Sequence, residues 1–323
     1  MVISMDILAT LLEGPRADGA FLLRSVMEPP WAMRIQDRAS LTLIALTSGA
    51  VTIVHEELDA EVEVRPGDIV VIKGPLPYTM GDCIGTTPQI LINPGNDCVT
   101  LAGEALVETM GLGVRTWGNS ADGSTVFLTG TYERSGEASR QLLDAIPTVI
   151  ISKGGLRRSP LVELLADEIV LDAPGQGAML DRLLDLVLVD TLRNWFAANA
   201  PQTPLWYQAL SDPTIGAALR MIHDDPGQDW SVASLATAVN VSRATFARRF
   251  VEQVGEPPMT YIKSWRLGLA ADLLADPNST VSSVARAVGY HSPFTFSTAF
   301  KRHYGASPSA YRGTDSSVGA RSS

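Results

Sequence analysis

Two short segments near the carboxyl end carry arginine, aromatic and small polar side chains on the outward face of a predicted helix. The outward positions are Ala244, Ala247 and Arg248 in the first segment and Phe294, Thr295, Ser297 and Thr298 in the second. Arginine can donate two hydrogen bonds to O6 and N7 of guanine, and threonine or phenylalanine can contact base edges and thymine methyl groups. These side-chain types favour base recognition in the major groove of DNA.

Basic residues around both segments suit the phosphate backbone, contacts to which orient a protein on DNA without specifying the sequence. The candidates for phosphate contacts are Arg243, Arg249, Lys263, Lys301 and Arg302. For any one of them, a solvated surface charge is the competing interpretation. Arg266 lies within the predicted helix that joins the two segments, so we expect it to pack or pair inside the protein instead.

The two segments belong to an internal repeat. The matching positions are Ser242, Phe246, Phe250 and Gly255 in the first copy and Ser292, Phe296, Phe300 and Gly305 in the second. The offset is 49 residues before the turn and 50 after it, which is typical of a duplicated supersecondary unit. Each copy predicts a capped helix, a turn containing Asn or Gly, and a second capped helix. This is a helix-turn-helix unit; a plain two-helix hairpin is the alternative for one copy alone.

Residues 229–312 also resemble the DNA-binding domain of the AraC/XylS family of bacterial transcription regulators. The resemblance rests on the stretches 242–250, Val288-Gly-Tyr290, 296–301 and 305–312. It implies two helix-turn-helix units joined by a long helix at 258–274, with recognition helices in successive major-groove segments roughly 34 Å apart. Ala244, Ala247, Arg248, Phe294 and Thr298 match positions that contact bases in the family. The family often has Arg in place of Thr298, so we expect weaker or more shape-dependent readout by the second unit.

The charge of the chain is unevenly distributed. Its net charge is −10, made up of −12 in residues 1–203 and +2 in residues 204–323. This basic excess is modest for a DNA-binding domain, so we expect weak nonspecific affinity and a homodimer that supplies binding strength.

The amino-terminal part predicts short strands separated by turns, which is typical of a sandwich or small barrel. The expected strands include 21–26, 40–46, 49–54, 61–65 and 68–72. The turn Arg65-Pro66-Gly67-Asp68, together with Pro30-Trp31, resembles the cupin-type sensor domain of one branch of the AraC family. The predicted fold class is α+β multidomain. It combines an N-terminal β-sandwich or cupin-like jelly roll, a helical dimerisation segment, and a C-terminal all-α double helix-turn-helix.

A cupin raises the question of a metal enzyme, because many cupins hold a metal ion on three histidines and a glutamate. Residues 1–200 contain one histidine, His55, and Tyr78 stands where a later cupin histidine would fall. Ligation by three histidines within this domain is therefore impossible. We expect no catalytic residues, no metal and no cofactor.

The remaining use of a barrel is to hold a small-molecule effector. Trp31, Arg34, His55 and Tyr78 are the candidate lining residues. A filled core that only dimerises, leaving a ligand-independent regulator, is one alternative. A redox sensor that uses Cys83 and Cys98 is another.

The expected domains are 1–158 for effector sensing, 159–203 for the helical dimerisation segment and linker, 204–313 for DNA binding, and 314–323 for a disordered tail. A helix at about 178–197 carries an apolar face too wide for one contact with the barrel, so we expect it to pack against the preceding helix and a second subunit; packing in the core alone is the competing interpretation. Two cysteines and no long apolar run favour the bacterial cytoplasm, at the nucleoid when bound, and no membrane. The expected partners are double-stranded DNA, a small-molecule effector, a second copy of the chain and, for an activator, RNA polymerase.

Overall fold

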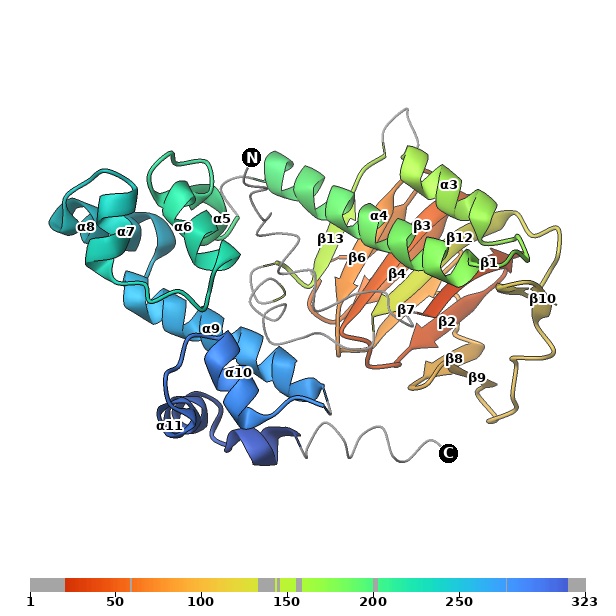
Figure 1. Ribbon diagram of the computed structural model, residues 1–323. Coiled ribbons are helices and arrows are strands. Elements are labelled where there is room, and N and C mark those ends of the chain that lie inside the picture. The colour runs from red at the N-terminus through yellow and green to blue at the C-terminus, as the bar shows by residue number, and fades with distance from the viewer. Residues whose placement is uncertain are drawn as a thin grey trace. The chain divides into compact units, whose positions relative to one another are not determined.

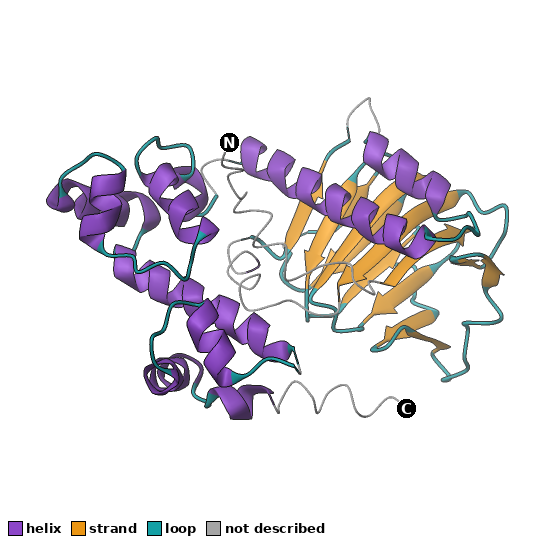
Figure 2. Cartoon of the chain, in the orientation of Figure 1, coloured by secondary structure: helices purple, strands orange, loops and turns teal. Residues whose placement is uncertain are grey.

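The computed structural model describes residues 21–58, 60–132, 143, 146–154, 159–199, 203–276 and 278–312. The described residues between 21 and 199, apart from 143, form one compact unit, and those from 203 to 312 form a second (Figure 1). The first is a sheet-rich unit with two helices, and the second is wholly helical (Figure 2). The predicted fold class, a sheet-rich amino-terminal part followed by an all-α carboxyl-terminal part, is therefore confirmed. The predicted tail at 314–323 lies outside the described residues.

Two β-sheets build the first unit. One has the strand order β10-β11-β1-β12-β3-β6-β13 and the other the order β5-β4-β7-β2-β8-β9. The first sheet consists of β1 (Phe21–Met27), β3 (Leu41–Ser48), β6 (Ile69–Lys73), β10 (Gly111–Gly113), β11 (Thr116–Gly118), β12 (Thr125–Tyr132) and β13 (Val149–Ser152). The second consists of β2 (Ala32–Ile35), β4 (Val51–His55), β5 (Val62–Val64), β7 (Tyr78–Gly81), β8 (Ile90–Asn93) and β9 (Asp97–Thr100). Strands that are distant in sequence pair in both sheets, as a jelly roll requires.

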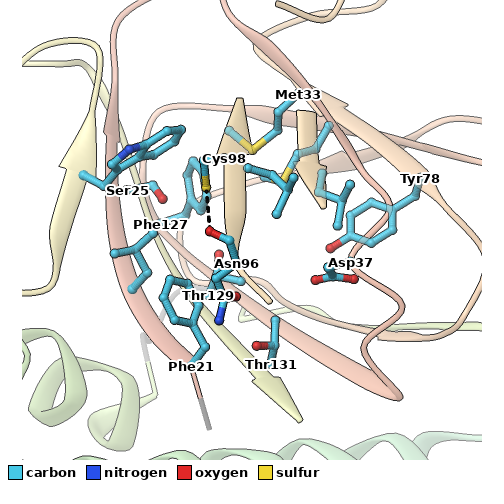
Figure 3. Close-up of a pocket in the computed structure, with 15 residues that line it drawn as sticks. Phe21, Ser25, Met33, Asp37, Tyr78, Asn96, Cys98, Phe127, Thr129 and Thr131 are labelled. Carbon is cyan, nitrogen blue, oxygen red and sulfur yellow. Dashed lines mark hydrogen bonds between the residues drawn. The ribbon is translucent and has the colours of Figure 1, made fainter. Parts of the chain in front are cut away.

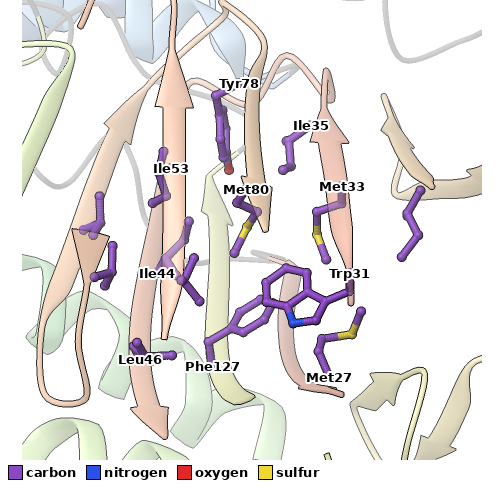
Figure 4. Close-up of a cluster of buried hydrophobic side chains, with 14 of the residues drawn as sticks. Met27, Trp31, Met33, Ile35, Ile44, Leu46, Ile53, Tyr78, Met80 and Phe127 are labelled. Carbon is purple, nitrogen blue, oxygen red and sulfur yellow. The ribbon is translucent and has the colours of Figure 1, made fainter. Parts of the chain in front are cut away.

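The core of this unit lies between the two sheets. Trp31 stacks on Phe127 across it, with ring centroids 5.6 Å apart (Figure 4). Both side chains are almost completely buried, and methionines and branched aliphatic residues from both sheets surround them. Aromatic side chains of this size contribute most of the apolar area that a core removes from water.

The turn that resembles a cupin signature is held by Asp68. Its carboxylate accepts hydrogen bonds from the backbone N–H groups of Arg65 and Gly154, each at 3.1 Å, and pairs with Lys153 Nζ at 2.9 Å. Burial alone would raise the pKa of Asp68, but these partners together hold it below its usual value. Gly67 supplies the left-handed backbone, at φ 94°, that lets the turn close.

Two helices cover the outer face of the larger sheet, α3 (Pro160–Glu168) and α4 (Gln176–Ala198) (Figure 1). Gly130 permits the close approach of α4, because a Cβ there would lie 2.5 Å from Leu184 Cδ1. The apolar face of α4 is buried within the single chain at Leu183, Leu184, Val187, Leu188, Thr191, Leu192, Trp195 and Phe196. Packing inside the chain therefore covers this face, and its width gives no argument for a second subunit.

The described part of the second unit is built from helices. They are α5 (Leu205–Ala209), α6 (Ile215–Asp224), α7 (Val232–Ala238), α8 (Arg243–Val254), α9 (Pro258–Ala275), α10 (Val281–Ala287) and α11 (Pro293–Tyr304). The repeat seen in the sequence is present in space as the pairs α7–α8 and α10–α11 (Figure 1). Across the described residues of both units, none of the helices combines the length and low charge that a membrane crossing requires.

The capping residues of both copies do what their types predict. Ser231 and Thr280 each form a reciprocal capping box with a serine three residues later. The side chain of Ser242 accepts from the N–H of Thr245 at the start of α8, and that of Ser292 accepts from the N–H of Phe294 at the start of α11. Gly255 and Gly305 end the two helices in the left-handed conformation. The local sequence therefore sets both ends of each recognition helix.

Candidate nucleic-acid interface and ligand cavity

Helix α8 turns Phe246 and Phe250 into the core and leaves its other side in water. Both phenylalanines are completely buried, and Phe250 meets Tyr261 of α9 edge to face with ring centroids 5.8 Å apart. Arg243, Ala244 and Arg248 are exposed on the opposite side, and Ala247 is half-buried. The predicted base-contacting side of α8 is thus an open surface.

Arg248 is paired on its own helix. Its Nη1 donates to the two carboxylate oxygens of Glu252 at 2.8 and 3.1 Å, and both side chains are more than half exposed. An exposed pair of this spacing is worth only about 0.3–0.5 kcal/mol. Arg248 can therefore exchange Glu252 for a guanine edge at little cost.

Arg249 is held inside the protein. Its Nη2 pairs with Asp212 Oδ2 at 2.8 Å and its Nη1 donates to Thr214 Oγ1 at 3.2 Å. Burial raises the pKa of Asp212, but hydrogen bonds from Ile215, Gln253 and Thr214 and the charge of Arg249 outweigh burial and lower it to about 2. This geometry favours a structural role for Arg249 over the predicted phosphate contact.

Helix α11 presents an uncharged face at its first turns. Phe294 is 81% exposed, which is unusual for a phenylalanine, and Thr295 and Thr298 are exposed beside it. The hydroxyl of Thr298 donates to the carbonyl of Phe294 at 3.0 Å. A hollow on this surface is lined by Phe294, Ser297, Thr298, Lys301, Arg302 and Ser307. The fold therefore brings predicted base and phosphate residues of the second copy together.

The other predicted phosphate-contacting cations are exposed, whereas Arg266 is bound within the protein. Lys263 is exposed on α9 and free to meet a phosphate, as Lys301 and Arg302 are on α11. Arg266 is half-buried and donates to backbone carbonyls of the loop before α7. This agrees with the prediction that it pairs within the protein.

A cavity of about 50 Å³ lies between the two sheets of the first unit (Figure 3). Its lining is Phe21, Leu23, Ser25, Met33, Ile35, Asp37, Tyr78, Met80, Ile92, Asn96, Cys98, Trp117, Phe127, Thr129 and Thr131. Most of these side chains are apolar, and none is a Lys, Arg or His. The carboxylate of Asp37 lies beside the hydroxyl of Tyr78 (Figure 3). Burial and the charge of Asp37 raise the pKa of Tyr78, so its hydroxyl stays protonated.

One polar atom of this cavity lacks a partner within the part of the chain that the structure describes. Thr131 is 5% exposed, and its Oγ1 forms no hydrogen bond with the described residues. Leaving a buried hydroxyl unsatisfied is unfavourable by about 1–3 kcal/mol. A group that hydrogen bonds to Thr131 would recover this free energy.

The four predicted lining residues do not lie together. Tyr78 lines the cavity, whereas Trp31 is in the stacked core and is not part of the lining. Arg34 is on the outer side of its strand, where it pairs with Glu56 at 3.6 Å and donates to Thr79. His55 is buried at the end of β4 and accepts at Nδ1 from the N–H of Glu57. The missed lining residues include Met33 and Met80, which alternation along their strands could have indicated.

The cysteines are free thiols in different surroundings. Cys83 is exposed and contacts Thr86 Oγ1, whereas Cys98 is buried and lines the cavity. Burial and the charge of Asp97 raise the pKa of the Cys98 thiol to about 11, which suppresses its reactive thiolate form. Among the described residues, no group of three or more His, Cys, Asp or Glu side chains could hold a metal ion.

Comparison with known proteins divides the chain as the fold does. Residues 6–197 match the family described as "Cupin", and residues 235–314 match the one described as "Helix-turn-helix domain". A putative AraC-like transcription regulator of Streptomyces lividans is 28% identical over 290 residues, which is 87% of this chain and 90% of the relative. The HTH-type transcriptional regulator AlkR of Acinetobacter baylyi is 36% identical over 140 residues, 43% of this chain and 45% of the relative.

Among solved structures, the DNA-binding domain of the global transcriptional factor AdpA in complex with a target DNA is similar to part of the chain. The sequence identity is 30% and the TM-score is 0.33. The similarity covers 34% of this chain and 99% of that domain.

Proposed function

Because the chain belongs to the cupin family across residues 6–197 and is a DNA-binding transcription regulator of the AraC type, we propose that α8 and α11 read one operator under the control of a small molecule held in the barrel. The observation that carries the DNA part is the repeated unit: two capped helices, each with its phenylalanines buried and its opposite side open. We expect the protein to act in the bacterial cytoplasm, at the nucleoid when bound.

Each recognition helix reads its own major-groove segment. In the first, Arg248 leaves Glu252 and donates to O6 and N7 of a guanine, while Ala244 and Ala247 leave room for neighbouring bases. In the second, Phe294 and the methyl groups of Thr295 and Thr298 contact thymine methyls, and Ser297 meets a base edge. The operator therefore has a guanine in one segment and thymines in the other.

The phosphate contacts come from four cations of the helical unit, each of them exposed: Arg243, Lys263, Lys301 and Arg302.

An operator bound by both subunits of a homodimer would double these contacts. Leu164 of α3 and Met179 and Leu186 of α4 are more than two-fifths exposed and are candidates for the subunit contact. Replacing Leu186 by Glu should then yield a monomer in sedimentation, and an unchanged dimer would remove this face from consideration.

The effector is a compact, neutral and mainly apolar molecule. A cavity of about 50 Å³ holds only about three to five water molecules, so a larger guest must displace side chains. Met33 and Met80 are unbranched and can change rotamer to admit it. An anionic ligand would be buried without a cation, which is unfavourable. A hydroxyl or carbonyl on the ligand would meet Thr131 Oγ1.

Genome-wide binding of the purified protein to fragmented DNA tests the DNA proposal. We expect one motif with two segments a helical turn apart, and loss of preference at one position with Arg248→Ala. Arg193→Ala removes an exposed arginine of the other unit and is the matched control. Without an enriched motif from folded wild-type protein, the proposal of operator reading fails.

A thermal-shift screen with neutral aromatic and alicyclic alcohols tests the effector proposal. A ligand that binds only the folded state must raise the melting temperature. Thr131→Ile narrows the cavity and removes its unsatisfied hydroxyl, so it should abolish the shift while keeping the fold. A shift that survives in this variant would place the ligand elsewhere.

A ligand-independent regulator is the second candidate, and the small size of the cavity favours it. It predicts no thermal shift with any compound and the same DNA binding in wild type and Thr131→Ile. The redox alternative is disfavoured by the burial of Cys98 and the raised pKa of its thiol.

A further inference from the structure

Helix α9 changes its packing partners at Arg266. Trp265, just before it, is completely buried and stacks on His223 of α6, with ring centroids 4.0 Å apart. Leu267, just after it, is completely buried in the cluster that contains Val284 and Phe296 of the second copy. One half of α9 therefore belongs to the first helix-turn-helix unit and the other half to the second, with Arg266 at the division.

The guanidinium of Arg266 is bound to the loop that leads into α7. Its Nε donates to the carbonyl of Pro226 at 2.7 Å and its Nη2 to the carbonyl of Gln228 at 2.5 Å. The loop is itself closed, because Trp230 Nε1 donates to the carbonyl of Asp225 at 2.8 Å. Arg266 thus links the middle of α9 to the first helix-turn-helix copy, at a point outside the buried core.

The turn between α10 and α11, in the second helix-turn-helix copy, packs on the same guanidinium. Gly289 has φ 78°, and a Cβ there would lie 2.9 Å from Arg266 Nη2, 3.0 Å from Arg266 Cζ and 2.7 Å from the carbonyl oxygen of Gly227. A Cβ on Gly227 would lie 3.1 Å from the carbonyl oxygen of Ala287. The loop before α7, the guanidinium of Arg266 and the turn between α10 and α11 are therefore in direct contact, without room for a side chain.

We propose that Arg266 is a positioning residue that locks the two helix-turn-helix units in one mutual orientation and so sets the operator spacing that the protein accepts. A single helix fixes the distance between the units but leaves bending and twisting about its middle. The guanidinium opposes both motions, because its planar fork donates to two carbonyls at once and presents a flat surface to Gly289. The exposed pair of His291 and Asp229, at 4.0 Å, adds little.

The consequence for DNA rests on the proposed function. Two recognition helices held rigidly match one spacing and one rotational phase of the groove. Inserting one base pair moves the second segment by about 3.4 Å and rotates it by about 35°. The wild-type protein should therefore discriminate sharply between spacings, and a protein with loosened units should not.

A distance measurement tests the lock without DNA. Spin labels at Val251→Cys on α8 and His303→Cys on α11, with Cys83 and Cys98 replaced by Ser, report the distribution of distances between the copies. Arg266→Met keeps length and helix propensity but removes every donor, so it should broaden the distribution. Arg220→Met is the matched control, because Arg220 donates to the Leu210 carbonyl beside the first helix-turn-helix copy and does not link the two copies. An equally narrow distribution in Arg266→Met overturns the proposal.

Operator variants test the consequence with the full-length chain. Using duplexes selected by the wild-type protein, Arg266→Met should bind the selected spacing at least about tenfold more weakly and should tolerate a one-base-pair insertion better than wild type does. Binding to a duplex that carries only one segment should be unchanged. Arg266→Lys keeps the charge and should be intermediate, which covers the case in which the methionine variant folds poorly.

The outcomes separate the two proposals. If the wild type selects no sequence, operator reading fails and the spin-label distances alone decide the role of Arg266. If the wild type selects a sequence and Arg266→Met lowers only the melting temperature, with the same spacing preference, then Arg266 merely stabilises the loop and the inference is wrong.

Discussion

The two helix-turn-helix copies share a scaffold and differ on the surface that we propose faces DNA. Both use a serine cap, two buried phenylalanines and a left-handed glycine at the end of the recognition helix. On α8 the outward side carries Arg248 paired with Glu252, whereas on α11 it carries Phe294 and two threonines without charge. Positions that hold the fold are thus similar in the copies, and the positions that we propose contact bases have diverged.

The difference indicates a division of labour. Under the proposed function, we expect discrimination by hydrogen bonds to be concentrated in the first copy, where a guanidinium can donate to both O6 and N7 of a guanine. We expect the second copy to depend on apolar contact and DNA shape, which give weaker preference at each base pair. Variants that affect one copy and spare the other can test this division.

The largest expected effect comes from the scaffold. Phe300→Ala removes a completely buried ring from the second copy and should lower the free energy of unfolding by about 3–5 kcal/mol. Phe294→Ala removes an exposed ring of the same helix and should change it by less than about 0.5 kcal/mol. Urea unfolding of both variants measures the contrast, and similar losses would mean that Phe294 is also part of the core.

Base discrimination should be lost mainly through the first copy. Arg248→Ala should reduce discrimination at one guanine by about 1–3 kcal/mol, because it removes both donors to that base. Thr298→Ala should cost less at its own position. Competition binding with single-base-substituted duplexes compares the two, and an equal or larger loss from Thr298→Ala would reverse the assignment.

Acid should destabilise the first copy through His223. Burial lowers the pKa of this histidine from 6.5 to about 3, whereas the cluster of the second copy contains no histidine. In the unfolded chain this histidine binds a proton below about pH 6.5, whereas in the folded chain it stays neutral until near pH 3. The free energy of unfolding therefore falls as the pH drops through this window. The loss should reach about 2 kcal/mol at pH 5.

Urea unfolding at pH 7.5 and pH 5 measures this loss. His223→Gln keeps a polar group near Tyr261, whose hydroxyl lies 2.7 Å from His223 Nε2 in the wild type. The variant should show a flatter dependence on pH. The same slope in both proteins would exclude His223 as its source.

The smallest effect distinguishes free cations from paired ones. Lys301→Ala should reduce the slope of log affinity against log salt by about 1, as expected for one lost phosphate contact. Arg249→Ala should leave the slope unchanged and lower stability, since it leaves Asp212 without its cation. Titrations at several salt concentrations decide, and a reduced slope for Arg249→Ala would restore its predicted contact with phosphate.

Local sequence was sufficient where the structure depends on neighbours along the chain. The capped helices of both copies, the strands at 21–27, 41–48, 51–55, 62–64 and 69–73, and the turn at Asp68 follow from hydrogen-bonding side chains, periodicity and glycine. The residues that line the cavity could not be predicted in this way. Residue type alone indicates Trp31, Arg34 and His55 as lining residues, but which face of a strand meets the opposite sheet depends on partners far away in sequence.

Arg248 and Arg249 show where the two kinds of information separate. They are adjacent, have the same side chain and lie on the same predicted helix. The sequence alone determined that this helix carries cations and, from the spacing of Phe246 and Phe250, that Arg248 is on its outward side. The tertiary structure decided that Arg249 pairs with Asp212, 37 residues earlier. Helix periodicity rotates adjacent residues by about 100°, so Arg249 points in another direction from Arg248, and only the packing of α8 against its neighbours decides which side chain it meets there.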